Sequence, residues 1–391
     1  MLSHATTCTF LLIAASSVVN GEDGLTYTPK NDVTKHSSIT LDQLDIKALI
    51  DDGDTEGARD IYLNGANREG KTLQQMARKD WVSEGIEDLT DYEAYATLFR
   101  PGNGEPYLDS YNVEALNCTG SFDGQSRAMC DISFKKNLLC TGLNYAQYEA
   151  VKGIQYKNEK NWDELFAFWN GVYDETIDSR VNSGGPGAVQ KSRDSDFKTS
   201  FREDSIQAII DGQKGFSDGF KKDKVEKAFE AFNKANLASF AQATLKYSAL
   251  FDEEGLEQDK KDKKWGEGYT YFRCGAGLMD PELAIYIDYV LDPRDKADVT
   301  LTPKGTFCKI VKKMLSLPEI GMGVKIGDLN LKEYPATSTI ESDCDIDSLA
   351  HVKAYGKSES QRTFIPFIGF LIVVGTYVGG YYKVKNALKE D

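Results

Sequence analysis

The stretch VEKAFEAFNKANLASFAQATLKY, residues 225–247, contains the most regular hydrophobic pattern in the chain. Its apolar side chains recur with a period near 3.6 residues, which is the period of an amphipathic α-helix. Val225, Phe229, Phe232, Phe240 and Tyr247 mark the pattern. This stretch predicts a long helix with one apolar face, and it is the strongest sign of a mainly α fold.

Shorter helical patterns lie on both sides of this stretch. Thr40 and Gln43 have the spacing of a capping box, and apolar residues follow them at helical intervals. We also expect helices near residues 58–64, 145–151, 162–169 and 265–290. After Pro293 the pattern becomes mixed, so the C-terminal end is expected to contain some short strands or irregular structure.

The chain also contains two segments of similar sequence, which we call the internal echo. The segments WDELFAFW, residues 162–169, and WGEGYTYF, residues 265–272, share the pattern Trp-x-Glu-x-aromatic-x-aromatic-aromatic and begin 103 residues apart. This similarity suggests internal duplication, although aromatic residues at such spacing are also common in ordinary cores. We therefore expect two helical lobes, at 40–181 and 188–293, joined by the linker NSGGPG at 182–187.

Two apolar segments predict how the chain is placed in the cell. Residues 10–19, FLLIAASSVV, predict a secretory signal peptide that ends near residue 21. Residues 363–382 carry no charge, and Lys383 and Lys385 follow at once, which predicts a transmembrane helix with a cytoplasmic tail at 383–391. A lipid-anchor signal is the alternative for this end. We expect a type I, single-pass protein of the plasma membrane.

The remaining parts of the predicted ectodomain are less regular. Residues 22–39 are polar and aperiodic, which predicts a mobile leader, and 294–362 are expected to form a mixed, disulfide-linked region and stalk. The sequon Asn117-Cys118-Thr119 predicts glycosylation at Asn117 on a surface loop. Six cysteines follow the signal: Cys118, Cys130, Cys140, Cys274, Cys308 and Cys344. They predict three bridges, of which at least one must join the first three cysteines to the last three.

Composition argues against two large classes of function. The chain has 61 acidic and 46 basic residues, a net charge of −15, which has the wrong sign for binding nucleic acid. It has three histidines and none of the usual motifs of hydrolases, metalloproteases or nucleotide-binding enzymes. After the signal, only His36 and His351 remain, and both lie in segments that we expect to be loosely held. We therefore expect a protein that is not an enzyme.

Oxygen donors, by contrast, are abundant. Twenty tyrosines and many carboxylates supply the hard ligands that suit ferric iron, calcium or manganese. Ferric iron favours phenolate, which directs attention to tyrosines that follow an acidic residue by two positions. Three such pairs are Asp60 with Tyr62, Asp109 with Tyr111, and Glu267 with Tyr269. For each tyrosine, an ordinary place in the core or on the surface is the competing interpretation.

Three phrases around these residues resemble a known family. The segments DIYLNGAN at 60–67, NWDELFAFWNG at 161–171 and KWGEGYTYFRC at 264–274 are similar to the iron-assimilation proteins of algae, whose membrane-anchored members are the phytotransferrins. The similarity covers about residues 40–292. It implies a cell-surface protein that captures Fe³⁺ with carbonate and delivers it by endocytosis. Acidified vesicles would release the iron, because protons compete for the same oxygens.

The candidate site residues are those near these phrases, because no family motif assigns the ligands. The candidate iron ligands are Asp60, Tyr62, Asp109, Tyr111, Glu164, Glu267 and Tyr269. The carbonate would need a cation, which Arg59, Arg127 or Arg273 could supply. Endocytic or ferric-reductase partners would act on such a protein, in the plasma membrane or in endosomal vesicles. The alternatives are a surface adhesion or receptor module without metal, and an extracellular enzyme linked to inorganic carbon supply.

Overall fold

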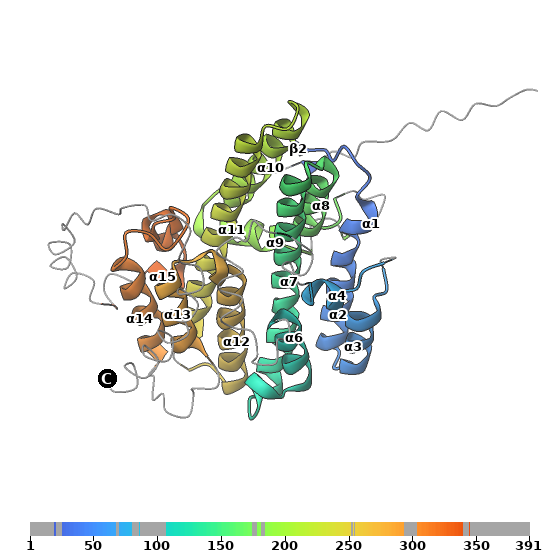
Figure 1. Ribbon diagram of the computed structural model, residues 1–391. Helices are drawn as coiled ribbons and strands as arrows, with labels where there is room; N and C mark the ends of the chain where they lie inside the picture. Colours follow the sequence, from blue (N-terminus) through green and yellow to red (C-terminus); the bar gives the residue numbers. More distant parts are fainter. Residues whose placement is uncertain are drawn as a thin grey trace, which may run out of the picture.

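Two helices of 30 residues each form the centre of the fold: α7 (Arg127–Tyr156) and α11 (Lys222–Phe251). In the computed structural model, each of them packs against the next long helix of the chain, α8 (Glu159–Asn170) and α12 (Gln258–Gly275) respectively (Figure 1). Helix α12 also lies against α7. The stretch 225–247 lies inside α11, so the helix predicted there is confirmed, as is the mainly α class.

The structure describes residues 19–20, 26–67, 70–79, 86, 107–173, 178–180, 184–251, 253, 255–292, 303–338 and 344. Most of the predicted signal peptide, the transmembrane segment 363–382 and the tail 383–391 lie outside these residues and stay predictions. Among the helices of the described ranges, none combines the length and the apolar character that a membrane span requires.

The N-terminal helices cover one side of α7. They are α1 (Thr34–Ser37), α2 (Ile39–Asp51), α3 (Thr55–Asn64) and α4 (Leu73–Ala77). Helix α6 (Tyr107–Asn117) and the 3-10 turn η1 (Gly120–Phe122) precede α7, and α6 packs along it. The capping box predicted at Thr40 and Gln43 is instead at Thr72 and Gln75, where it starts α4. Thr40 donates to the Ser37 carbonyl inside the core.

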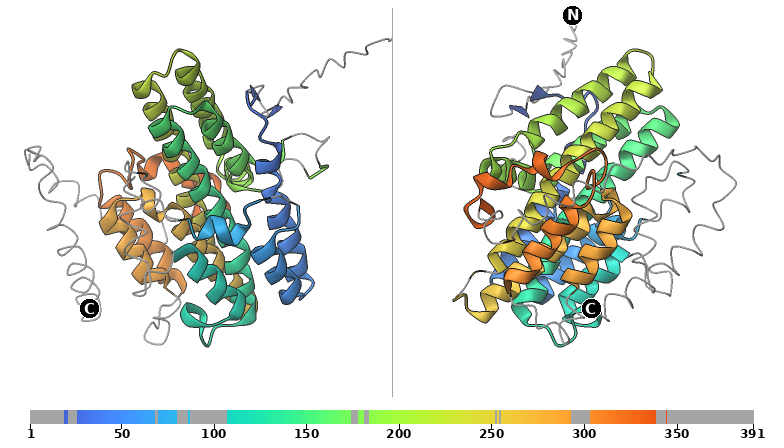
Figure 2. Two further views of the ribbon diagram at one scale, coloured as in Figure 1. Left: turned by 45° about the vertical axis from the view of Figure 1, so that its right-hand side comes forward. Right: turned by 90° about the vertical axis from the view of Figure 1, so that its left-hand side faces the viewer.

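The second half of the chain adds the helices around α11. They are α9 (Pro186–Phe197), α10 (Phe201–Ser217), α13 (Pro281–Leu291), α14 (Pro303–Leu315) and the short α15 (Pro335–Ser338). Three 3-10 turns connect them: η2 (Ala276–Leu278), η4 (Ile326–Leu329) and η5 (Leu331–Glu333). Helices α10 and α11 form a hairpin that extends past the ends of the other helices (Figure 2). In place of the short strands expected after residue 293, the described residues there contain one isolated bridge, Gly321 with Val324.

The two aromatic segments of the internal echo occupy equivalent positions. Each lies on the buried helix that follows a 30-residue helix, and each tryptophan indole donates to a backbone carbonyl of a neighbouring helix. Trp162 donates to Ile209 at 2.8 Å, and Trp265 donates to Leu291 at 2.7 Å. The aromatic side chains are core residues. Gly212 leaves room for one of them, because a Cβ there would lie 2.0 Å from the Trp162 ring.

Residues 26–39, which we expected in a mobile leader, are folded onto the bundle. Strand β2 (Thr26–Tyr27) pairs antiparallel with β1 (Val19–Asn20). The Tyr27 side chain is buried, and its hydroxyl donates to Asp163 on α8. Asp163 also accepts hydrogen bonds from the backbone amides of Lys30 and Asn31. The prediction is wrong here because one buried carboxylate holds a polar segment that has no periodic pattern of its own.

The described part of the expected linker, residues 184–187, is packed into the protein. Gly184 and Gly185 are buried, and a Cβ at Gly185 would lie 2.8 Å from the Trp169 carbonyl oxygen. Pro186 is the first residue of α9, a position where proline suits a helix. Glycine is needed in this segment because two backbones approach closely. One hydrophobic core runs through both expected lobes, so the predicted boundary at 182–187 is wrong.

Three disulfides connect the six cysteines, as predicted. Cys118–Cys130 and Cys308–Cys344 each link neighbouring segments, and Cys140–Cys274 links α7 to α12. The Cys140–Cys274 bridge joins one of the first three cysteines to one of the last three, as the odd number of cysteines in each group requires. Asn117, the predicted glycosylation site, is the exposed last residue of α6.

Candidate metal-binding site

Three of the candidate residues, Tyr111, Tyr269 and Arg273, lie together in the core where α6 meets α12. The ring centroids of the two tyrosines are 6.2 Å apart. The guanidinium carbon of Arg273 is 4.2 Å from the centre of the Tyr111 ring and 5.6 Å from that of Tyr269. All three side chains are buried. The structure thus brings together residues that are more than 150 positions apart in the sequence.

Two carboxylates complete this cluster: Asp288 on α13 and Asp292 directly after it. The Tyr269 hydroxyl donates to Asp288 Oδ1 at 3.0 Å and accepts from Arg273 Nη1 at 3.3 Å. Asp292 is buried, and its charge acts on both tyrosines. Two phenols, two carboxylates and one guanidinium therefore share one buried space, which we call the Tyr111–Tyr269 cluster.

Both phenols of the cluster hold their protons firmly. Burial raises the pKa of Tyr269 well above its usual value, Asp288 and Asp292 raise it further, and Arg273 opposes them. Burial also raises the pKa of Tyr111, and Arg273 again opposes the shift. Each phenol is neutral at physiological pH. A metal ion that binds their oxygens must displace the phenol protons.

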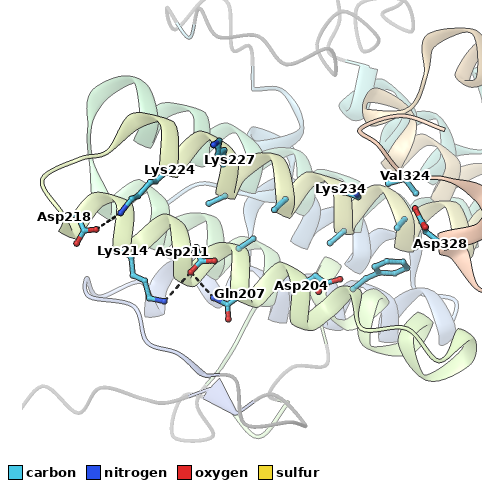
Figure 3. A pocket seen from close by; sticks show the side chains of 16 residues that line it. Asp204, Gln207, Asp211, Lys214, Asp218, Lys224, Lys227, Lys234, Val324 and Asp328 are labelled. Atoms are coloured by element: carbon cyan, nitrogen blue, oxygen red, sulfur yellow. Dashed lines mark hydrogen bonds and ion pairs between the residues drawn. The ribbon is translucent and has the colours of Figure 1, made fainter. Parts of the chain in front are cut away.

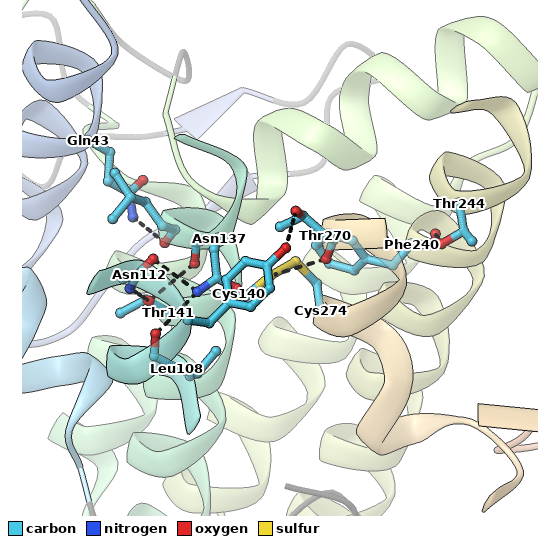
Figure 4. Close-up of a disulfide and its surroundings, with 12 residues drawn as sticks. Gln43, Leu108, Asn112, Asn137, Cys140, Thr141, Phe240, Thr244, Thr270 and Cys274 are labelled. Atoms are coloured by element: carbon cyan, nitrogen blue, oxygen red, sulfur yellow. Dashed lines mark hydrogen bonds between the residues drawn. A yellow bond between two sulfur atoms is a disulfide. The ribbon is translucent and has the colours of Figure 1, made fainter. Parts of the chain in front are cut away.

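Helical spacing and a disulfide position the cluster. Tyr269 and Arg273 are one turn apart on α12, and Asp288 and Asp292 are four residues apart at the end of α13, so each pair shares one side of its segment. Cys274, next to Arg273, bridges α12 to α7 (Figure 4). One turn before Cys274, the Thr270 hydroxyl is hydrogen-bonded to that of Tyr111 at 3.0 Å. The bridge therefore fixes the stretch of α12 that carries the site.

Tyr62 and Asp109 form a second tyrosine–carboxylate pair. The Tyr62 hydroxyl donates to Asp109 Oδ1 at 2.8 Å and accepts from Asn112 Nδ2 at 3.1 Å. Arg78 Nε lies 3.6 Å from the other Asp109 oxygen. Burial, and then Asp109, raise the pKa of Tyr62 well above its usual value. This pair brings one phenol and one carboxylate, fewer oxygen donors than the Tyr111–Tyr269 cluster.

Glu164 lies in a separate carboxyl pair with Glu149. Its Oε1 is 3.3 Å from His36 Nε2 and 3.7 Å from Lys160 Nζ. Glu149 is buried and accepts a hydrogen bond from Asn161 at 2.6 Å. Burial and the charge of Glu149 raise the pKa of Glu164 to about 7. His36 is therefore held against a carboxylate rather than in a loose segment.

We expect Glu164→Gln to stabilise the protein at about pH 8 by about 1–3 kcal/mol. The pKa of Glu164 rises on folding from 4.5 to about 7. The folded state therefore favours the protonated form, and this contribution to stability is complete below about pH 4.5 and lost as pH rises through about 7. Urea unfolding at about pH 5.5 and pH 8 measures it, with Glu226→Gln on the surface of α11 as the control. An effect of Glu164→Gln that is the same at both pH values would contradict the assignment.

Glu267 lies among cations. It forms ion pairs with Lys136 and Lys264, each at 3.4 Å. The rings of Tyr247 and Tyr271 stack nearby with centroids 5.4 Å apart, and each lysine lies within 6 Å of one ring. Two lysines beside one carboxylate make this group less suited to binding a cation than the Tyr111–Tyr269 cluster.

The other three candidates lie apart from these groups. Asp60 is exposed on α3 and accepts a hydrogen bond from Asn64 at 2.7 Å. Arg59 donates to the Asn117 side chain, and Arg127 donates to a backbone carbonyl of α6. The structure does not bring Asp60, Arg59 or Arg127 to the Tyr111–Tyr269 cluster, because each is on the outer face of its helix.

Sequence reasoning missed Asp288 and Asp292. The signal was present, since both are charged residues that flank the apolar segment YVL within PELAIYIDYVLD, residues 281–292. Among the described residues, no group of three or more His, Cys, Asp and Glu side chains is placed to share a metal ion. A metal site in the Tyr111–Tyr269 cluster therefore depends on tyrosine oxygens in addition to the two carboxylates.

Comparisons of this chain with protein-family models, with curated proteins and with solved structures find no match. The resemblance to the phytotransferrins stays an expectation from three sequence phrases.

Proposed function

We propose that this protein captures ferric iron at the cell surface, with Tyr111, Tyr269, Asp288 and Asp292 as its oxygen ligands. The observation that carries the proposal is the convergence of two phenols and two carboxylates in one buried cluster. Phenolate and carboxylate are hard donors, and they suit a small trivalent ion better than they suit the softer metals that prefer thiolate or imidazole. Two carboxylates beside one guanidinium also make the cluster attractive to a cation.

Arg273 would hold the carbonate that accompanies the iron. Its guanidinium already touches the Tyr269 hydroxyl and lies over the Tyr111 ring, so an anion bound to it would reach a metal held by the same tyrosines. Because the cluster is buried, iron can enter only when a covering element moves. In this proposal that element is helix α13, which has 11 residues and carries Asp288.

Binding by protonated phenols makes the affinity depend on pH. Each phenolate that binds Fe³⁺ releases a proton, so acid reverses the reaction and favours release. In this proposal the predicted signal peptide and transmembrane helix display the protein outside the cell, and endocytosis carries the iron to an acidified vesicle. The protein acts as a carrier rather than as an enzyme, and a reductase or an endocytic partner would act on the loaded form.

A competition titration tests the proposal. The full chain, purified in detergent, is mixed with ferric nitrilotriacetate with and without bicarbonate, at about pH 7 and about pH 5, and the iron on the protein is measured after separation. We expect the protein to take the iron at neutral pH in the presence of bicarbonate and to lose it in acid. Iron that stays on the chelator under all four conditions would refute the proposal.

A further inference from the structure

A groove of about 820 Å³ runs between α10 and α11, and none of the residues that line it belongs to the Tyr111–Tyr269 cluster (Figure 3). Its floor is made of alanines: Ala208, Ala228, Ala231, Ala235 and Ala238. The four on α11 follow steps of three, four and three residues, which is the spacing of the contact positions between packed helices. Small side chains at these positions allow another helix to approach closely.

The two sides of the groove carry opposite charges. Helix α10 contributes Asp204 and Asp211 together with Lys214, and α11 contributes Lys224, Lys227 and Lys234. Asp204 and Asp211 are seven residues apart, as are Lys227 and Lys234, which places each of these two pairs about two turns apart on one side of its helix. All of these side chains are exposed, and Lys214 and Lys224 form ion pairs with Asp211 and Asp218. The groove therefore has an acidic bank on α10 and a basic bank on α11.

The charges of the two banks are only partly neutralised within the hairpin. Asp211 forms an ion pair with Lys214 on its own helix, at 3.3 Å. Asp204 is exposed but partly desolvated by its neighbours, and this desolvation and the charge of Asp194 raise its pKa, while Lys234 lowers it from across the groove. Within the part of the chain that the structure describes, neither Lys227 nor Lys234 makes an ion pair with a carboxylate.

A face with these two banks is complementary to itself. Two copies can face each other across a two-fold axis that runs parallel to the hairpin. This arrangement places α10 of each copy over α11 of the other. A rotation about such an axis does not shift a residue along the axis, so equivalent residues of the two copies stay at the same level. Gly215 on α10 and Val225 on α11 lie side by side, so these two residues are at the same level along the hairpin. We count residues along each helix from this pair. Lys227 is then about two residues (~3 Å) from the level of Asp211, and Lys234 is equally far from the level of Asp204. Both lysines would thus meet an aspartate of the facing copy.

We propose that two copies of this chain associate through the groove between α10 and α11, forming an antiparallel four-helix bundle. The alanine floors make the contact, and the banks determine its register. Burying alanines removes little apolar surface, so the dimer should be reversible and weakened by salt. The inference does not depend on iron binding, and its test uses protein without added iron.

Two charge-reversed proteins test the dimer. The first carries Asp204→Lys with Asp211→Lys, and the second carries Lys227→Asp with Lys234→Asp. Each makes both banks of its own groove the same sign, so each alone should be a monomer. Mixed together, they restore opposite charges on both sides. Light scattering of the full chain in detergent should give twice the monomer mass for the natural sequence and for the mixture, and the monomer mass for each variant alone.

A control separates this effect from a general change in net charge. Asp52→Lys with Asp123→Lys changes the charge by the same amount as the first variant, at exposed positions directly after α2 and η1 that do not line the groove, and this protein should still dimerise. Circular dichroism of each variant checks that the helices are intact. A monomeric natural protein, a dimer in either reversed variant alone, or a mixture that stays monomeric would each overturn the proposal. If the natural protein is monomeric, the groove would be available to a helix of another protein.

Discussion

Tyr269→Phe should lower the affinity for ferric iron by more than about 100-fold. Changes to groups that merely orient a metal ligand commonly cost about 10–100-fold, and loss of a ligand should exceed that. Tyr269 is the residue of the cluster that contacts both a carboxylate and the guanidinium, so its hydroxyl lies where the metal and the anion would meet. Competition against a ferric chelator at neutral pH, with bicarbonate present, measures the change.

Tyr62→Phe is the matched control. It removes the same hydroxyl from another buried tyrosine that donates to an aspartate, at 2.8 Å, in a different part of the core. We expect it to leave iron affinity unchanged and to cost about 1–2 kcal/mol of stability, because Asp109 loses a hydrogen bond. Equal losses of affinity in the two variants, or none in Tyr269→Phe, would contradict the assignment of the ligands.

Replacing Cys140 and Cys274 together by alanine should lower the free energy of unfolding by about 5 kcal/mol. The two residues are 134 positions apart, and a longer closed loop restricts the unfolded chain more. The bridge also holds α12 against α7 beside Arg273. Urea unfolding under non-reducing conditions, monitored by circular dichroism, measures the loss.

The bridge between Cys118 and Cys130 supplies the comparison. It spans 12 residues, so its removal by the same substitutions should cost about 3 kcal/mol. If removal of this bridge lowers the free energy of unfolding as much as removal of Cys140–Cys274, or more, then the stabilisation does not come from linking the two halves of the chain.

The periodic parts of the fold could be predicted from the sequence. Helix α11 was predictable because its apolar residues keep one period over most of its length. The backbone conformation in the interior of such a helix depends little on the neighbouring elements. The need for one bridge between the two groups of cysteines followed from their number alone. The choice of Cys140 and Cys274 could not be predicted, because it depends on the packing of α12 against α7.

The errors came from segments whose structure is decided by distant residues. Gly184 and Gly185 have the composition of a linker, but they are buried where the start of α9 meets the end of α8. Tyr27 belongs to a polar segment, yet Asp163, 136 residues away, holds it in the core. In both cases the local pattern was correctly described, and a tertiary contact overrode the structure that it normally favours.

The candidate site could be predicted only in part. Tyr111, Tyr269 and Arg273 were among the candidates because they lie in or near phrases rich in tyrosine and acid. Their grouping with Asp288 depends on where α13 packs, which no local pattern specifies. The same reasoning also selected Asp60, which is exposed, because a sequence motif does not show which face of a helix is buried.

The central claim is that two phenolates bind the iron, and the visible absorption spectrum of the iron-loaded full chain tests it most directly. With bicarbonate at neutral pH, the account predicts a phenolate-to-iron charge-transfer band that weakens in Tyr269→Phe and disappears when Tyr111→Phe is added. Tightly bound iron without such a band in the natural protein, or a band that survives both substitutions, would contradict it.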